Sequence, residues 1–312
     1  MAIDDASPAF IDIKNLSKSF GAVTAVDDLT LTVRKGEIVG FLGPNGAGKS
    51  TTMKMIAGFL KPDAGSIAIC GEDIASAPAA AQGKLGYLPE GAPSYGEMTP
   101  RRFLGFIADA RGFRKTQKAK AIDNAATRAQ LGQVMDRRIE TLSKGFRRRV
   151  GLAQAILHDA PVLVLDEPTD GLDPNQKFAV RRLIRSMAAD KAILVSTHIL
   201  EEVDALCDRV VVIDGGRLAA EGTPAELLAK SRYKNAVSVD APPEAAEAIR
   251  NSLKAFADRA DVRETKQEGV VVFDIFPRNG ASMVLDIAAA LDGGPRPKGI
   301  YAERGRLDDI FR

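Results

Sequence analysis

A glycine-rich segment follows directly on a short apolar run near the start of the chain, and this pair restricts the fold more than any other feature. The apolar run is Ile38–Leu42, and the segment Gly43–Ser50 fits the pattern G-x-x-x-x-G-K-[ST]. Glycines let a backbone wrap closely around phosphate oxygens, and a helix that begins after them directs its positive end at an anion. The pattern therefore predicts a phosphate-binding loop between a strand buried on both faces and a helix from about Lys49 to Phe59.

Each residue type in this loop has its own part in holding a nucleoside triphosphate. We expect the Lys49 ammonium to reach the β- and γ-phosphates, which also makes it a candidate catalytic residue, and the Ser50 hydroxyl to ligate Mg²⁺. The expected nucleotide-binding residues of this segment are Gly43, Pro44, Asn45, Gly46, Ala47, Gly48, Lys49, Ser50 and Thr51. The alternative, an ordinary glycine turn, is disfavoured by the strand and helix patterns on either side.

Two further apolar runs extend the predicted sheet. They are Val162–Leu165 and Ala192–Val195, and helical patterns separate them from the first run. Buried strands that alternate with helices predict a parallel α/β sheet. Earlier in the chain, Phe10–Ile13 and Leu29–Val33 alternate between apolar and polar residues as half-buried strands do. The region 99–157 is mainly helical in pattern.

Two acids stand where the second apolar run ends. A buried strand that ends in a carboxylate can deliver it to a metal ion, and this is the role that we predict for Asp166. Glu167 lies one residue further, at the mouth of the sheet, where it can take a proton from an attacking water. A solvated acidic strand end is the alternative, and the phosphate-binding loop disfavours it.

Composition and charge exclude several classes of protein. The chain is 45% hydrophobic and 27% charged, as in a globular protein with a sizeable core, and its net charge of +2 gives no general basic excess for nucleic acid. The longest stretch without a charged residue, 38–48, has eleven residues, whereas a membrane span needs about 20. Residues 1–10 lack a basic segment followed by an apolar run, so we expect no secretory leader.

Cysteine and histidine are too scarce for a disulfide framework or a multi-histidine metal centre. The only cysteines are Cys70 and Cys207, which we expect to be small buried residues in a reducing compartment. The only histidines are His158 and His198. We expect His158 to be structural.

The pattern changes near Ala229. Beyond it the order of predicted elements is strand, helix, strand, strand, helix, strand, which is the ferredoxin-like arrangement. We therefore predict two domains, 1–230 and 231–312, the second a small α+β domain. At its end, Leu307, Ile310 and Phe311 share one face of an expected helix.

Three more segments resemble motifs of ABC-type ATPases. Leu142–Phe146 with the following Arg147–Ala153 resembles their signature sequence, Pro168–Pro174 resembles the loop after their catalytic carboxylates, and His198 stands at the position of their switch histidine. The resemblance covers about residues 10–228. It implies a P-loop NTPase (RecA-like) core with an N-terminal antiparallel β subdomain and a helical signature subdomain.

The resemblance also implies roles for residues outside the loop. Two copies would close head to tail around two ATP molecules, so that Ser143 and Gly145 of one copy touch the γ-phosphate held by the other. Asp173 would lie at that interface. His198 would hold the γ-phosphate and the water, and the ring of Phe20 would stack on adenine.

The sequence departs from the family pattern at two places. Glu90 stands where the family usually has glutamine, and its carboxylate can still ligate Mg²⁺. We expect the free subunit to hold Glu90 away from the nucleotide until a membrane partner moves its loop. In the signature, Lys144 and Phe146 replace glycine and glutamine. These departures resemble export-type members such as gliding-motility, copper-maturation and drug-export ATPases. The Arg147–Arg149 run is expected to be a partly solvated helix face rather than a nucleic-acid site.

Together these features predict the ATP-hydrolysing subunit of a bacterial ABC exporter. Its cofactors would be ATP and Mg²⁺, and its partners integral membrane permease subunits and a second copy of itself, with no nucleic acid. Its place would be the cytoplasm, peripheral to the inner face of the membrane. The alternatives are an importer ATPase with a substrate-sensing ferredoxin-like domain, a soluble ABC protein acting on ribosomes or DNA, and another P-loop enzyme. The transported substrate is not readable from the sequence.

Overall fold

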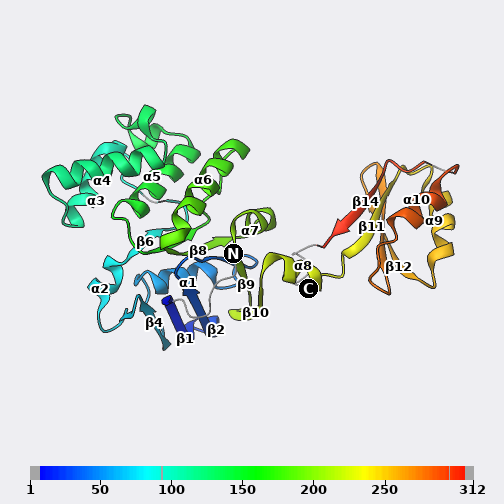
Figure 1. Ribbon diagram of the computed structural model, residues 1–312, viewed down its shortest axis with the longest axis horizontal. Helices are drawn as coiled ribbons and strands as arrows, with labels where there is room; N and C mark the ends of the chain where they lie inside the picture. The colour runs from blue at the N-terminus through cyan, green and yellow to red at the C-terminus, as the bar shows by residue number, and fades with distance from the viewer. Residues whose placement is uncertain (1–7, 93, 295, 306–312) are drawn as a thin grey trace. The chain divides into compact units, whose positions relative to one another are not determined.

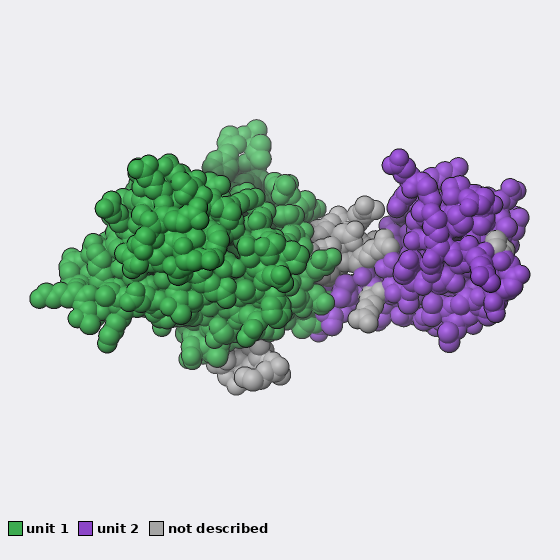
Figure 2. Space-filling view, turned by 90° about the horizontal axis from the view of Figure 1, so that it is seen from above, with its two compact units in different colours: residues 1–224 green, residues 225–312 purple. Residues whose placement is uncertain are grey.

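The computed structural model describes residues 8–92, 94–294 and 296–305. The chain forms two compact units, Met1–Pro224 and Ala225–Arg312 (Figure 1, Figure 2). The structure therefore divides the chain six residues before the predicted boundary, and helix α8 (Pro224–Lys230) lies almost wholly in the second unit. The helix face predicted for Leu307, Ile310 and Phe311 lies outside the described residues.

A six-stranded sheet forms the centre of the first unit. Its strand order is β10-β9-β3-β8-β7-β6, in which β9, β3, β8, β7 and β6 pair in parallel and β10 pairs antiparallel with β9. Its strands are β3 (Ile38–Leu42), β6 (Leu85–Leu88), β7 (Val162–Asp166), β8 (Ala192–Thr197), β9 (Arg209–Asp214) and β10 (Arg217–Gly222). Every residue of β3 and β7 is buried, as predicted from their unbroken apolar runs.

An antiparallel sheet packs against this central sheet. Its order is β2-β1-β4-β5, and its strands are β1 (Ala9–Phe20), β2 (Val23–Arg34), β4 (Ala64–Ile69) and β5 (Glu72–Asp73). Strands β1 and β2 extend well beyond the segments expected from alternation. Ile11 and Ile13 of β1 share one buried cluster with Phe41 of β3 and Val164 of β7, so the two sheets enclose a common core.

Helices complete the first unit. Helices α3, α4 and α5 contact one another and lie at the opposite end of the unit from β1, β2 and β4 (Figure 1). The α-helices are α1 (Lys49–Ile56), α2 (Pro78–Gly83), α3 (Pro100–Ala110), α4 (Lys115–Arg128), α5 (Lys144–Ile156), α6 (Pro174–Met187) and α7 (Leu200–Leu206). Short 3-10 turns are η1 (Gly132–Val134), η2 (Ile139–Thr141) and η3 (Ala188–Asp190). Polar side chains cap α3, α5 and α6; at the start of α3 the hydroxyl of Thr99 accepts a hydrogen bond from the Arg102 amide.

The arginine run of α5 forms the predicted partly solvated face at only one of its three positions. Arg147 is exposed, but Arg148 and Arg149 are only 5% and 9% exposed. Arg149 donates to the Gln130 side-chain oxygen at 3.0 Å, and its guanidinium lies 5.7 Å from the ring centre of Phe146. Arg148 and Arg149 leave solvent because their guanidinium groups find acceptors inside the unit, which offsets part of the loss of hydration.

The second unit has the element order that the sequence predicted. Its elements after α8 are β11 (Lys234–Ala241), α9 (Ala246–Leu253), η4 (Lys254–Phe256), β12 (Ala260–Gln267), β13 (Val270–Pro277), α10 (Val284–Leu291) and β14 (Gly299–Arg304). The sheet is antiparallel in the order β12-β13-β11-β14. Val237, Phe273 and Ile275 of the sheet form one core with Ile249 of α9 and Ile287 of α10.

Across the described ranges, no helix is both long enough and apolar enough to pass through a lipid bilayer. This agrees with the short charge-free stretches of the sequence.

His158 is a half-buried structural histidine between α5 and β7. Its Nε2 lies 3.0 Å from the carbonyl oxygen of Leu85, and its Nδ1 is buried with no hydrogen-bond partner in the described part of the chain. Burial, together with the nearby charge of Arg111, lowers the pKa of His158 to about 4. The folded chain therefore holds this imidazole in its neutral form.

We predict that His158 contributes to loss of stability in mild acid. The unfolded chain takes up a proton at its ordinary pKa near 6.5, whereas the folded chain resists it down to about 4, so stability is full above 6.5 and falls as the pH approaches 4. His158→Gln keeps a donor for Leu85 and should remove about 2 kcal/mol of that fall between pH 7 and 4.5. Urea unfolding at several pH values measures it, with His198→Gln as the control. Equal acid dependence in all three proteins would contradict the prediction.

Candidate active site

The loop after β3 has glycine where main chain from other strands comes very close. A side chain at position 43 would place its Cβ 2.3 Å from the Ile213 carbonyl oxygen of β9, and one at position 48 would lie 2.3 Å from the Ala25 carbonyl oxygen of β2. Gly48 also has a φ of +104° where it begins α1, a conformation that L side chains rarely adopt. Packing against two strands thus holds the loop in place at the positive end of α1.

Lys49 lies across the loop that precedes it. Its Nζ donates to the carbonyl oxygens of Gly43 at 2.7 Å and Pro44 at 2.9 Å, and only 6% of the residue is exposed. Burial lowers the pKa of Lys49, while the negative charges of Glu167 and Asp166 act in the opposite direction. A phosphate entering the loop would give this ammonium a charged acceptor in place of neutral carbonyls.

Asp166 has an oxygen that the rest of the site leaves without a partner. The residue is 1% exposed at the end of β7, and its Oδ1 accepts a hydrogen bond from the Ser196 hydroxyl of β8. Its Oδ2 is buried and has no hydrogen-bond partner among the described residues. A buried carboxylate oxygen without a partner is costly, and a hard cation such as Mg²⁺ would satisfy it. The residues present therefore fit a divalent cation at this strand end.

Glu167 and His198 form a direct pair beside Asp166. The His198 Nδ1 and Glu167 Oε1 atoms are 2.7 Å apart, with 49% and 16% of the two side chains exposed. The Glu167 amide donates to the carbonyl oxygen of Ser196 at 3.2 Å and to its hydroxyl at 3.1 Å. Strands β7 and β8 are parallel neighbours, so their carboxyl ends bring these residues together. A carboxylate oriented in this way can act as a general base.

A cavity of about 310 Å³ lies between the loop and the end of the sheet. Its lining residues are Ala25, Asn45, Gly46, Gly48, Lys49, Ser50, Thr51, Glu90 and Glu167. The expectation that the free subunit holds Glu90 away from this position is wrong. The loop after β6 already brings Glu90 to the cavity, where its charge acts on Lys49.

Four sequence-predicted residues lie elsewhere. Ser143, Gly145, Asp173 and Phe20 all belong to the described part of the chain, and none of them lines the cavity. Ser143 caps α5 by accepting from the Phe146 amide, and Asp173 caps α6 by accepting from the Gln176 amide at 2.9 Å. The Phe20 ring is exposed, with the Lys18 ammonium 5.7 Å from its centre. A single copy therefore assembles only part of the predicted site.

Comparison with known proteins assigns the family. A family profile described as ABC transporter matches residues 26–170. Nod factor export ATP-binding protein I of Burkholderia orbicola is 38% identical over 98% of this chain and 96% of its own length. The protein of the same description from Ralstonia nicotianae is 34% identical over 98% and 93% of the two chains. The chain belongs to the ABC transporter ATP-binding proteins.

Solved structures agree with this assignment. A structure described as the ATP binding subunit of an ABC transporter has a TM-score of 0.66 and 32% identity, covering 71% of this chain and 92% of that one. The cbiO1 protein of Clostridium perfringens, described as part of the transporter complex cbiONQ, has a TM-score of 0.64 and 25% identity over 80% and 96% of the two chains. The first unit is thus the P-loop core of an ABC ATPase, and the chain is an ATP-binding, ATP-hydrolysing transporter subunit.

The ABC ATPase contains a buried acid that the sequence analysis missed. Glu202 of α7 is 5% exposed, accepts hydrogen bonds from the hydroxyls of Thr169 and Thr197, and pairs with Lys177 at 3.1 Å. It thereby joins the segment after Glu167 to the strand end before His198. Its position four residues after His198 was the available signal, but an acid on a short helix is ordinarily exposed.

We predict that Lys49→Ala abolishes ATP binding by this ABC ATPase. The change removes the buried cation at the phosphate-binding loop, whereas Lys54→Ala removes an exposed lysine from the same helix and should leave binding unchanged. Titration with a fluorescent ATP analogue measures both variants. Wild-type affinity in Lys49→Ala would refute the assignment of this lysine.

Proposed function

We propose that this ABC ATPase powers an exporter, with ATP hydrolysed between two copies and the substrate moved by separate membrane subunits. The observation that carries the proposal is the Glu167–His198 pair at 2.7 Å, placed beside the Lys49 cavity. Export is supported by the two relatives, which are named as export ATP-binding proteins. This chain matches them over almost their whole length. An importer ATPase with a substrate-sensing second domain remains the alternative.

The chemistry follows from the charges of these side chains. The loop amides and Lys49 would hold the β- and γ-phosphates, and the Glu167 carboxylate would accept the proton of the attacking water. With its proton on Nδ1, His198 would donate to Glu167 Oε1 and so orient the base.

Mg²⁺ would be held by few protein groups. No cluster of three or more His, Cys, Asp or Glu suited to a metal occurs within residues 8–92, 94–294 and 296–305, so phosphate oxygens would complete the coordination. We assign Ser50 and Asp166 as its protein ligands, with Glu90 as a further oxygen donor at the same cavity. When bound, Mg²⁺ would neutralise charge on the phosphates.

The second copy would supply what one chain lacks. Ser143 and Gly145 lie at the start of α5 and Asp173 at the start of α6, and none of them lines the Lys49 cavity. In a head-to-tail pair they would close over the γ-phosphate of the other copy, while the exposed ring of Phe20 would stack on adenine.

We predict that Glu167→Gln binds ATP normally, lowers turnover by about 10²–10⁴-fold and accumulates as an ATP-bound dimer. Glutamine keeps the shape of the side chain but cannot accept the proton. Steady-state hydrolysis and light scattering with ATP and Mg²⁺ measure the two effects, and Glu201→Gln, at an exposed position nearby, is the control. A variant that stays monomeric at saturating ATP would count against the head-to-tail site.

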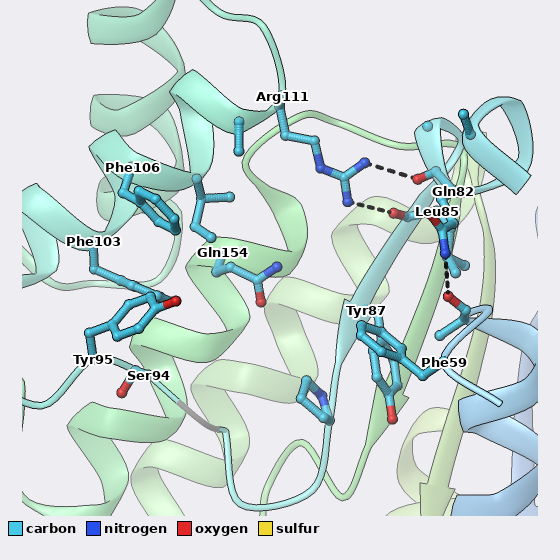
Figure 3. A pocket seen from close by; sticks show the side chains of 16 residues that line it. Phe59, Gln82, Leu85, Tyr87, Ser94, Tyr95, Phe103, Phe106, Arg111 and Gln154 are labelled. Carbon is cyan, nitrogen blue, oxygen red and sulfur yellow. Dashed lines mark hydrogen bonds between the residues drawn. The ribbon is translucent and has the colours of Figure 1, made fainter.

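An aromatic groove supports docking of a membrane subunit. A cavity of about 1000 Å³ lies between α3 and the strand end of β6 (Figure 3). Tyr95 and Phe106 stand on one side of it and Phe59 on the other, and these three side chains are 50%, 46% and 74% exposed. Pro89 lines the groove next to Glu90, which lines the ATP cavity. We assign the groove to an apolar helix from a cytoplasmic loop of the permease, because its occupant would touch the Glu90 loop directly.

We predict that Phe106→Ser weakens stimulation of hydrolysis by the permease. The change removes one aromatic wall of the groove, whereas Phe178→Ser alters an exposed ring on α6 outside it. The ratio of ATPase rates with and without reconstituted membrane subunits should fall several-fold in the first variant only. Equal ratios in both variants would exclude this groove as the docking site.

The two predicted domains would divide the work. We propose that residues 1–230 carry all nucleotide chemistry and that residues 231–312 serve dimerisation or contact with a partner. The residues assigned above to ATP and Mg²⁺ all precede residue 199. A subunit that docks on permease loops would lie in the cytoplasm, peripheral to the inner face of the membrane.

A further inference from the structure

Arg148 of the signature helix is buried against the catalytic end of the sheet. It is 5% exposed. Its Nη1 donates to the carbonyl oxygen of Pro89 at 3.1 Å, and its Nη2 donates to the carbonyl oxygens of both Asp166 and Glu167. One guanidinium therefore joins three parts of the chain that are far apart in sequence: α5, the loop that carries Glu90, and the end of β7.

The main chain at Glu167 needs such support. Its φ is +49°, in the left-handed region that residues other than glycine, asparagine and aspartate seldom adopt. Such a conformation persists only where neighbouring groups hold it. The Ser196 carbonyl and hydroxyl hold the Glu167 amide on one side, and Arg148 holds the Glu167 carbonyl on the other.

The contacts of Arg148 are those of a residue that positions others. The hydrogen bonds found for its side chain all go to main-chain oxygens, although Asp166, Glu167, Asp170 and Glu90 are near enough for their charges to act on it. A planar guanidinium can donate to several carbonyls at fixed angles, which a lysine ammonium on a flexible stem does less well. Because main-chain oxygens accept these bonds, the carboxylates stay available for ATP chemistry.

We infer that Arg148 is a positioning residue for Glu167: its guanidinium fixes the main chain that aims the general base and ties it to the loop carrying Glu90. The inference rests on the proposed role of Glu167. It gives the arginine run a function in hydrolysis rather than in solvation, and it makes the orientation of the base depend on where α5 and the Glu90 loop lie.

The first test separates turnover from binding. Arg148→Gln removes the charged fork, Arg148→Lys keeps the charge without the fork, and Arg147→Gln alters the exposed neighbour as the control. Misplacing a catalytic group by about 1 Å can cost about 10²-fold in rate, so we expect kcat to fall by about that factor in Arg148→Gln and less in Arg148→Lys.

The affinity for a fluorescent ATP analogue should stay within about twofold of the wild type in all three variants, because none of these residues lines the Lys49 cavity. A wild-type kcat in both Arg148 variants, or a parallel loss of ATP affinity and thermal stability, would overturn the inference.

The second test asks whether Arg148 acts through Glu167. If it does, adding Arg148→Gln to Glu167→Gln should lower single-turnover hydrolysis no further, since the base is already absent. An additional loss of about 10-fold or more would show an independent role and overturn the inference. Where Arg148→Gln is too unstable to assay, Arg148→Lys enters the same cycle. Failure of the proposed function looks different: Glu167→Gln alone would then hydrolyse ATP at the wild-type rate.

Discussion

The shared carboxyl edge of the parallel strands is the constraint on which the rest of this structure depends. Strands β3, β7 and β8 are neighbours in one sheet and run in the same direction, so whatever follows each of them meets at one place. The phosphate-binding loop follows β3, Asp166 ends β7 with Glu167 directly after it, and His198 follows β8. Burial of these strands on both faces holds the edge in register.

Charges buried behind this edge are held largely by main-chain oxygens. Lys49 donates to carbonyls of its own loop, and Arg148 donates to carbonyls of the Glu90 loop and the β7 end. Neutral acceptors satisfy most of these donors, though not the Nε of Arg148, and they do not neutralise the two charges. The site therefore sets two cationic side chains among the carboxylates of Asp166, Glu167 and Glu90. Among the described residues the Oδ2 atom of Asp166 has no hydrogen-bond partner, so the arrangement suits a polyphosphate that brings its own cation.

On the proposed function, division of the site between two copies would explain why some of the predicted site residues do not line the Lys49 cavity of one chain. The residues assigned to the phosphates and the attacking water lie at one sheet edge, whereas Ser143 and Asp173 serve as caps at the starts of α5 and α6. The groove lined by Phe59, Tyr95 and Phe106 reaches the Glu90 loop from the other side. On the proposed function, one loop would thus respond to both the membrane partner and the nucleotide, with Arg148 as its link to the general base.

The sequence by itself determined the elements whose signals are local. The phosphate-binding loop, the buried strands and the position of the Asp166–Glu167 pair at a strand end were predictable because each signal lies within a short segment of characteristic residue types and spacing. The tertiary structure alone decided the partners of Arg148, the hydrogen bonds of Ser196 and Glu202, and the place of Glu90 at the Lys49 cavity. Those contacts join residues that are remote along the chain. Whether an arginine on a helix meets water or a carbonyl depends on which face the packing buries.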